Sequence, residues 1–331
     1  MKITKSWVAA VAGVGLLGLG LAGSPASAEP NGTPQYRALA GVGSDTTENV
    51  MNGLSDVITV GGQKVIGSYN ANGGGNVTTK DPAVNPACTI ARPNGSTAGR
   101  TALLTSLQAN ANAGDGCLDF ARSSSSRGSF TSDPNMVWIP FAIDAVSFGV
   151  RSDGSVPKSL TLAQVQSIFK CQVASFKPVL PQPGSGTRSY WLGQMGVTEA
   201  EITAGTYPCL TGVGTTASRA YSQENDGRAL KTDEIMPYSI AQWQSQATAV
   251  VTDVRGKTVL GTIDGNAPTV IDSAFGIKRD VFNIVPQSKL ATSPTSDVFV
   301  GPSSLICQNT ATIKKYGFAP NPNCGDTSSV S

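Results

Sequence analysis

Three short turns rich in Gly, Ser and Thr each come directly before a stretch with the apolar spacing of a helix. They are Gly43–Thr47, Gly95–Arg100 and Gly184–Arg188. The first N–H groups of a helix have no partner inside it, and the helix dipole adds partial positive charge there. Capping alone explains any single turn, because Ser, Thr and Asp are ordinary N-cap residues. Three such turns in one chain favour a second interpretation, an anion held by several helix N-termini.

Strand-like and helix-like patterns alternate along the chain. The first strand is expected over 36–42, and a helix follows with Val50, Met51 and Leu54 at helical spacing. Pro140 and Asp144 interrupt the longest apolar stretch, residues 136–150, so we expect two consecutive strands there. The alternation favours an α/β fold with largely parallel sheets, and about 300 residues usually form two lobes. Further strands are expected over 65–69, 118–121, 234–240, 258–263 and 274–285, and further helices from 94, 159, 185 and 198 and over 242–249 and 302–316.

Three pairs of residues have the spacing of a capping box, in which an N-cap side chain and the third helical residue exchange hydrogen bonds. They are Asp45 with Glu48, Thr161 with Gln164, and Thr198 with Glu201. Each pair predicts a helix start.

The N-terminus has the three parts of a secretory signal peptide, residues 1–28. Lys2 and Lys5 are basic, Trp7–Leu21 is apolar, and Ala26–Ala28 is a small-residue cleavage site, which makes Glu29 the expected first residue. No later run of about 18 apolar residues follows, and no Cys lies near the cleavage site. We therefore expect a secreted, extracellular protein without a membrane or lipid anchor.

Charge and composition exclude several classes of function. Removing the two signal lysines from the 24 basic residues leaves 22, which equals the number of acidic residues. A mature net charge of about zero argues against general binding to nucleic acid. The chain has no His, which excludes Ser-His-Asp and Cys-His nucleophiles and the common zinc sites. We therefore expect no enzyme, no metal site and no cofactor.

Six cysteines in a secreted chain indicate disulfides. Fifteen pairings of six cysteines are possible. The cysteines fall in three separate neighbourhoods, which favours sequential pairing into three local loops. The expected pairs are Cys88–Cys117, Cys171–Cys209 and Cys307–Cys324.

From about Gly41 to Leu290, the order of motifs resembles the phosphate-binding proteins of bacterial phosphate ABC importers. The motifs include GVGSDTT, NGSTAGR, CLDFARSSS, IPFAIDAVSFGV, PGSGT, EIMPYS, IDGNAP and FGIKRDVFNIV. The resemblance implies a two-lobed, type II periplasmic-binding-protein-like α/β fold with a ligand cleft between the lobes. Lobe one would comprise 29–140 and 240–331, and lobe two 141–239. Inorganic phosphate or a related oxyanion would be the ligand, an ABC permease is a candidate partner, and we expect a monomer.

The same resemblance places hydroxyl, N–H and guanidinium donors at the cleft. The family usually has Arg and Asp just before the SGT motif, where this chain has Pro181 and Pro183. It also has an Asp after the DF-like strand to accept the phosphate proton, where this chain has Arg122 and serines. Arg188, Arg122 or Arg100 could supply the positive charge, and Asp45 or Asp144 the acceptor. The candidate ligand-binding residues are Ser44, Asp45, Thr46, Thr47, Ser96, Arg122, Ser123, Ser124, Ser185, Gly186, Thr187 and Arg188.

Two other functions are open at this point. The chain could be a secreted binding or scaffold module with the same fold that has lost or changed its ligand, which the two prolines before GSGT favour. It could also be a hydrolase that uses Ser185 or a carboxylate, although no neighbouring base is visible in the sequence.

Overall fold

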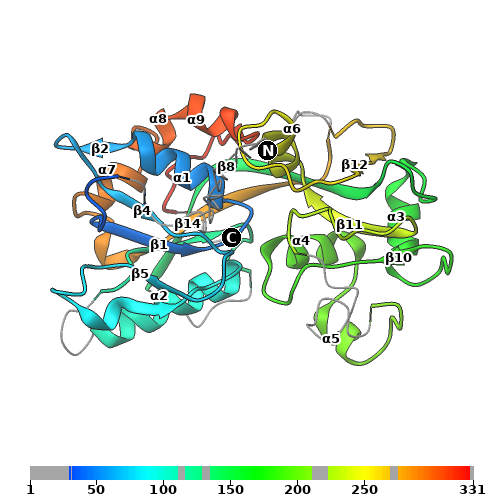
Figure 1. The fold of residues 1–331 in the computed structure, drawn as a ribbon, viewed down its shortest axis with the longest axis horizontal. Helices are drawn as coiled ribbons and strands as arrows, with labels where there is room; N and C mark the ends of the chain where they lie inside the picture. Colours follow the sequence, from blue (N-terminus) through cyan, green and yellow to red (C-terminus); the bar gives the residue numbers. More distant parts are fainter. Residues whose placement is uncertain are drawn as a thin grey trace, which may run out of the picture.

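Two lobes lie side by side and share one mixed sheet (Figure 1). The computed structural model describes residues 30, 32–110, 116–128, 135–210, 223–268 and 275–328. The expected signal peptide, residues 1–28, lies outside the described residues. Within the described part of the chain, no helix is long and apolar enough to cross a membrane.

Lobe one is organised around three parallel strands. The strand β1 (Leu39–Gly43) lies between β4 (Ile66–Ser68) and β7 (Phe120–Ser123). Two helices, α1 (Glu48–Val57) and α2 (Ser96–Asn110), pack on these strands. The carboxyl ends of β1 and β7 meet at one edge, which is where α/β sheets bind ligands. The other elements of this lobe are β2 (Thr59–Val60), β3 (Gln63–Lys64), β5 (Asn76–Thr78), the 3-10 helix Pro86–Cys88, β6 (Thr89–Ala91), α7 (Thr295–Phe299), α8 (Leu305–Gln308), α9 (Thr310–Lys315) and β15 (Ala319–Pro320).

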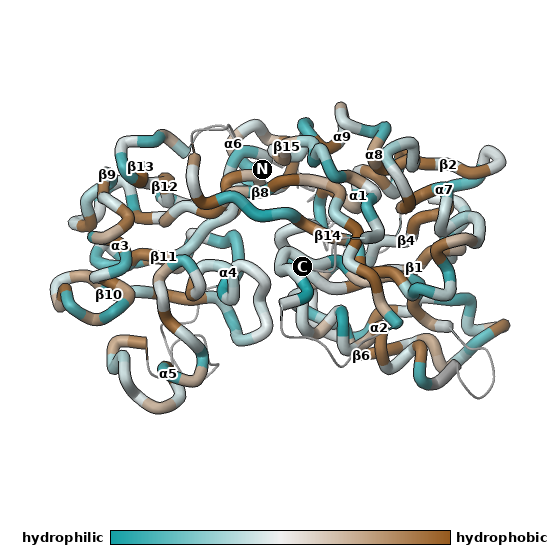
Figure 2. Tube along the Cα trace, turned by 180° about the vertical axis from the view of Figure 1, so that it is seen from behind, coloured by the Kyte–Doolittle hydropathy of each residue, from teal (hydrophilic) through white to brown (hydrophobic). Residues whose placement is uncertain are grey.

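One long strand, β8 (Met136–Arg151), runs through both lobes (Figure 1). We predicted two strands here, and that prediction is wrong. β8 continues past Pro140 because the register against β14 (Lys278–Pro286) shifts at this point, where a residue without an N–H is tolerated. The residues of β8 are mostly buried, and the strand is largely brown in Figure 2.

Lobe two is built on the second half of β8. There β11 (Glu234–Ser239) pairs antiparallel with β8, and β10 (Lys177–Pro178) pairs parallel with β11. The helices of this lobe are α3 (Leu162–Phe169), α4 (Gly186–Met195) and α5 (Glu199–Thr203), and α6 (Ile240–Ala247) follows β11. Trp191 of α4 packs edge-on against Phe169 of α3, at 5.6 Å between ring centroids.

We expected the chain to return to lobe one at residue 240, but the strands that come next pair with strands of lobe two. Downstream of it, β12 (Thr258–Leu260) pairs with β8 at Gly149–Arg151, and β13 (Thr262–Ile263) pairs with β9 (Ser159–Leu160). Ile263, Phe275 and Ile277 also belong to the apolar core of lobe two. We therefore propose that the chain returns to lobe one through β14.

Two of the three expected capping boxes are present. Thr161 caps α3 and Thr198 caps α5, each with reciprocal hydrogen bonds to the third helical residue. The pair Asp45–Glu48 is not a capping box. α1 begins at Glu48, and the Asp45 carboxylate accepts hydrogen bonds from Asn72 and Asn225 instead. A tertiary contact has replaced the local one.

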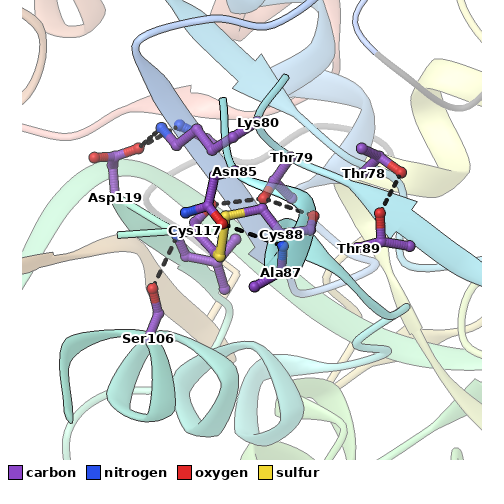
Figure 3. The surroundings of a disulfide bond; sticks show 12 residues. Thr78, Thr79, Lys80, Asn85, Ala87, Cys88, Thr89, Ser106, Cys117 and Asp119 are labelled. Carbon is purple, nitrogen blue, oxygen red and sulfur yellow. Dashed lines mark hydrogen bonds and ion pairs between the residues drawn. A yellow bond between two sulfur atoms is a disulfide. The ribbon is translucent and has the colours of Figure 1, made fainter. Parts of the chain in front are cut away.

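All six cysteines form disulfides, in the sequential pairs that the spacing favours. They are Cys88–Cys117, Cys171–Cys209 and Cys307–Cys324. Figure 3 shows the first pair, where Thr79 donates to the Cys117 carbonyl at 2.7 Å. Lys80 and Asp119 form an ion pair beside it, at 2.6 Å between Nζ and Oδ2. The bridge fastens the 3-10 helix before β6 to the segment that leads into β7.

Candidate functional site

Three serines from the carboxyl edge of lobe one form a buried chain of hydrogen bonds. Ser44 follows β1, Ser124 follows β7 and Ser96 begins α2. The Ser44 hydroxyl donates to Ser124 Oγ at 3.0 Å, and Ser96 Oγ accepts from the Ser124 N–H at 3.0 Å. The parallel pairing of β1 and β7 brings these three sequence-distant turns together.

The first turn of α4 in lobe two lies directly against these serines. Thr187 Oγ1 is 3.1 Å from Thr46 Oγ1 in lobe one. A Cβ on Gly186 would overlap the hydroxyls of Ser96 and Ser124, so only glycine permits this approach. Thr97 N–H also donates to the Gly184 carbonyl at 3.2 Å. The lobes therefore touch through their helix N-termini. We call the residues Ser44, Thr46, Ser96, Ser124 and Thr187 the hydroxyl cluster.

Arg279 on β14 supplies a positive charge to the hydroxyl cluster, and the sequence analysis did not select it. Its Nη2 donates to Thr187 Oγ1 at 2.8 Å, and its Nη1 donates to the Ser124 carbonyl at 3.1 Å. The same guanidinium pairs with Asp144 on β8, at 2.8 Å between Nη2 and Oδ2. The other Asp144 oxygen accepts from Ser239 Oγ at 2.8 Å. Asp144 thus positions Arg279 by an ion pair. Pro181 and Pro183, which precede the α4 turn, have no charged side chain to form such a pair.

Glu224 brings a carboxylate to the hydroxyl cluster, and it was also missed. Its Oε1 accepts from Thr46 Oγ1 and Thr187 Oγ1, each at 2.5 Å. The side chain is 3% exposed, and Oε2 has no hydrogen-bond partner among the described residues. Glu224 lies in a polar loop without a motif, so no local pattern pointed to it.

The other candidates from lobe one face protein groups near the cluster. Burial raises the pKa of Asp45 well above its usual range, and repulsion from Glu48 and Glu224 adds to this. Arg122 is fully buried, with Nε toward the Ser44 carbonyl and Nη1 toward Ser68 Oγ at 3.0 Å. Burial lowers the pKa of Arg122 to about 10, against the attraction of Glu48 and Asp45. The Arg122 guanidinium therefore holds the backbone of the turn at Ser44 through the Ser44 carbonyl.

The remaining candidates have mainly structural contacts. The Thr47 hydroxyl is buried and has no hydrogen-bond partner among the described residues. Ser123 Oγ donates to the Ser125 carbonyl at 2.7 Å, and Ser185 Oγ caps α4 by accepting from the Arg188 N–H at 3.1 Å. The Arg188 guanidinium pairs with Glu199 at 2.6 Å, and it donates to the Pro181 carbonyl. The turns selected from the sequence, at Ser44, Ser96 and Thr187, therefore lie together. The guanidinium of Arg279 donates to a hydroxyl of this cluster, that of Thr187.

A polar cavity of about 500 Å³ adjoins Glu224 at the lobe boundary. Its walls come from the start of α1, from the loop after β4, from α6 and from residues 223–228. Most of its lining side chains are amides or carboxylates, among them Asn49, Asn72, Asp226 and Gln242.

The chain matches no protein-family model, and no curated protein matches it by sequence. Solved structures do match. A Clostridium perfringens protein assigned as a phosphate ABC transporter substrate-binding protein, with bound phosphate, has a TM-score of 0.54 at 13% identity, covering 86% of this chain and 99% of that chain. An ABC-type phosphate transport receptor from Vibrio cholerae has a TM-score of 0.50 at 16% identity, covering 86% and 100%. The chain therefore shares its fold with these two proteins. The predicted α/β, type II periplasmic-binding-protein-like fold class is therefore confirmed.

Proposed function

We propose that this chain is a solute-binding protein that holds phosphate or a similar oxyanion between its two lobes. The observation that carries the proposal is the convergence of hydroxyls from both lobes with the guanidinium of Arg279. Thr46 and Thr187 come from different lobes, and their hydroxyl oxygens are 3.1 Å apart. A tetrahedral oxyanion accepts many hydrogen bonds, and donors arranged around one point match it.

The donors at this site have the strength that such a ligand needs. A hydrogen bond between neutral groups contributes about 0.5–1.5 kcal/mol, and one to a charged group about 1.5–3 kcal/mol. The N–H groups of Gly186 and Thr187 open α4, where a helix leaves its first donors unpaired. Burial excludes water from the hydroxyl cluster, so each bond is electrostatically stronger than it would be in water.

The proposal includes a location and a partner. The solved structures of the same fold include a phosphate ABC transporter substrate-binding protein and a phosphate transport receptor. We propose that this chain acts outside the cytoplasm as a monomer and delivers its ligand to an ABC permease. Three disulfides are consistent with an extracytoplasmic location.

Titration calorimetry of the purified protein with phosphate, arsenate and sulfate tests the proposal. Thr187→Val removes one hydroxyl at nearly constant volume, and we expect it to weaken binding about 5- to 30-fold. Thr187→Ser keeps the hydroxyl and is the matched control, with affinity close to that of the parent protein. A thermal-shift assay complements the calorimetry, because a ligand at 100 times its Kd adds about 2.7 kcal/mol to the free energy of unfolding. No heat and no stabilisation with any oxyanion would refute the proposed function.

A further inference from the structure

The carboxylate of Glu224 lies where an oxygen of the ligand would be expected. Its Oε1 accepts hydrogen bonds from Thr46 in lobe one and from Thr187 in lobe two, each at 2.5 Å. The Thr187 hydroxyl oxygen also accepts from Arg279 at 2.8 Å. One oxygen from the chain itself therefore joins the two lobes through the donors assigned to the oxyanion.

A hydroxyl has a single hydrogen to donate. When Thr46 and Thr187 both donate to Glu224, neither has a hydrogen left for an incoming oxyanion. Electrostatic repulsion also opposes binding of an oxyanion beside the Glu224 carboxyl group. The guanidinium that donates to the Thr187 hydroxyl, that of Arg279, is already paired with Asp144. A dianion that entered beside the Glu224 carboxyl group would also lie near the carboxylate of Asp144. The carboxylate and the oxyanion therefore exclude each other at these donors.

Glu224 has a place to move to. It lines the polar cavity of about 500 Å³, together with amide side chains such as Asn49 and Asn72 and with the carboxyl groups of Asp45, Glu48 and Asp226. The next residue is held firmly: the carbonyl of Asn225 accepts from Tyr238 Oη at 2.5 Å and from Gln246 Nε2 at 2.9 Å. Because the backbone is anchored at Asn225, a movement of the carboxylate into the cavity would be a change of the Glu224 side-chain rotamer.

The second oxygen of Glu224 shows that its present position is not fully satisfied. Oε2 is buried and has no hydrogen-bond partner among the described residues. A buried acceptor without a partner is unfavourable, so the hydrogen bonds of Oε1 must compensate for it. A ligand that takes over the donors of Oε1 removes that compensation and releases the side chain.

We propose that Glu224 is an internal ligand that the oxyanion must displace. In the ligand-free protein its carboxylate occupies the hydroxyl donors and holds the lobes together, and on binding it turns into the adjoining cavity. The inference rests on the proposed function. It makes Glu224 a residue that sets affinity by competition and not by contact with the bound oxyanion.

Calorimetry with phosphate and with sulfate on Glu224→Ala, Glu224→Gln and the parent protein tests this. We expect both variants to bind both anions at least tenfold more tightly than the parent. Asp226→Asn is the matched control. It removes one negative charge from the same loop and the same cavity wall, where the Asp226 carboxylate pairs with Arg228. We expect its affinity to stay within about twofold of the parent.

Small-angle scattering provides a second readout that does not depend on affinity. Ligand-free Glu224→Ala should have a larger radius of gyration than the ligand-free parent, and phosphate should return it to the compact value.

The possible failures are distinguishable. If Glu224→Ala binds phosphate equally or more weakly than a parent that does bind, the displacement inference is overturned and the proposed function stands. If no protein in the set binds any oxyanion, both are overturned.

Discussion

Arg279 and Asp144 face each other across β14 and β8 as directly paired residues, and their side chains form a buried ion pair of 2.8 Å. The exposed fraction is 3% for the arginine side chain and 0% for the aspartate side chain. Both strands pass between the lobes, so the pair lies where the lobes meet. The pair therefore combines two tasks, the neutralisation of Asp144 and the delivery of a guanidinium to Thr187.

Arg279→Gln separates these two tasks. Breaking a buried pair by removing one partner costs about 3–5 kcal/mol of stability, because the other charge stays buried. Oxyanion affinity should fall about 10- to 150-fold, since a charge-assisted hydrogen bond is lost. The double variant Asp144→Asn/Arg279→Gln should regain most of the stability but not the affinity. Denaturant unfolding and calorimetry measure the two quantities, and recovery of affinity in the double variant would contradict the role of Arg279.

Gly186→Ala tests the contact between the lobes. A Cβ at this position would overlap Ser96 Oγ and Ser124 Oγ, so the first turn of α4 must withdraw from lobe one. We expect a loss of oxyanion binding of at least 100-fold and a larger radius of gyration, with little change in the unfolding temperature. Gly193→Ala, in the same helix with no atom near its Cβ position, is the control. Unchanged binding by Gly186→Ala would show that the lobes need not meet here.

Arg188 is a candidate ligand from the sequence, and its contacts predict a structural role. Its guanidinium pairs with Glu199 and donates to the Pro181 carbonyl. We expect Arg188→Gln to lower stability by about 1–3 kcal/mol, because the buried carbonyl loses its donor. Oxyanion affinity should change by less than about threefold. A loss of affinity above tenfold in a folded variant would restore Arg188 as a ligand contact.

Asp45 predicts a pH dependence of stability. Burial, with repulsion from Glu48 and Glu224, raises its pKa well above 3.8, so the folded state keeps the proton that the unfolded state releases. Stability is therefore favoured near and below pH 3.8 and lost as pH rises toward the folded pKa. Asp45→Asn should raise Tm relative to the parent by more at pH 7 than at pH 4. Each kcal/mol corresponds to about 2–4 °C.

The control for Asp45→Asn is Asp56→Asn, an exposed carboxylate on α1. Its effect on Tm should be small at both values of pH. An equal effect of Asp45→Asn at pH 4 and pH 7 would mean that Asp45 does not retain its proton on folding.

Local chemistry explains what could be predicted from the sequence. Thr161 and Thr198 cap their helices as expected, because a capping box depends on residues only three positions apart. The turns at Ser44, Ser96 and Gly186 could be selected from the sequence because hydroxyl-rich helix starts leave donors unpaired. The sequential disulfides follow from short loops, in which the chain keeps both cysteines near each other.

The tertiary structure alone decided which charges reach these donors. Asp144 and Arg279 are 135 residues apart, and the register of β8 against β14 places them together. Glu224 reaches Thr46 across 178 residues from a loop without a motif. The position of a hydroxyl at a helix start is determined by the residues beside it in the chain. A buried charge depends on partners brought by folding, because desolvation makes an unpaired charge too costly to keep.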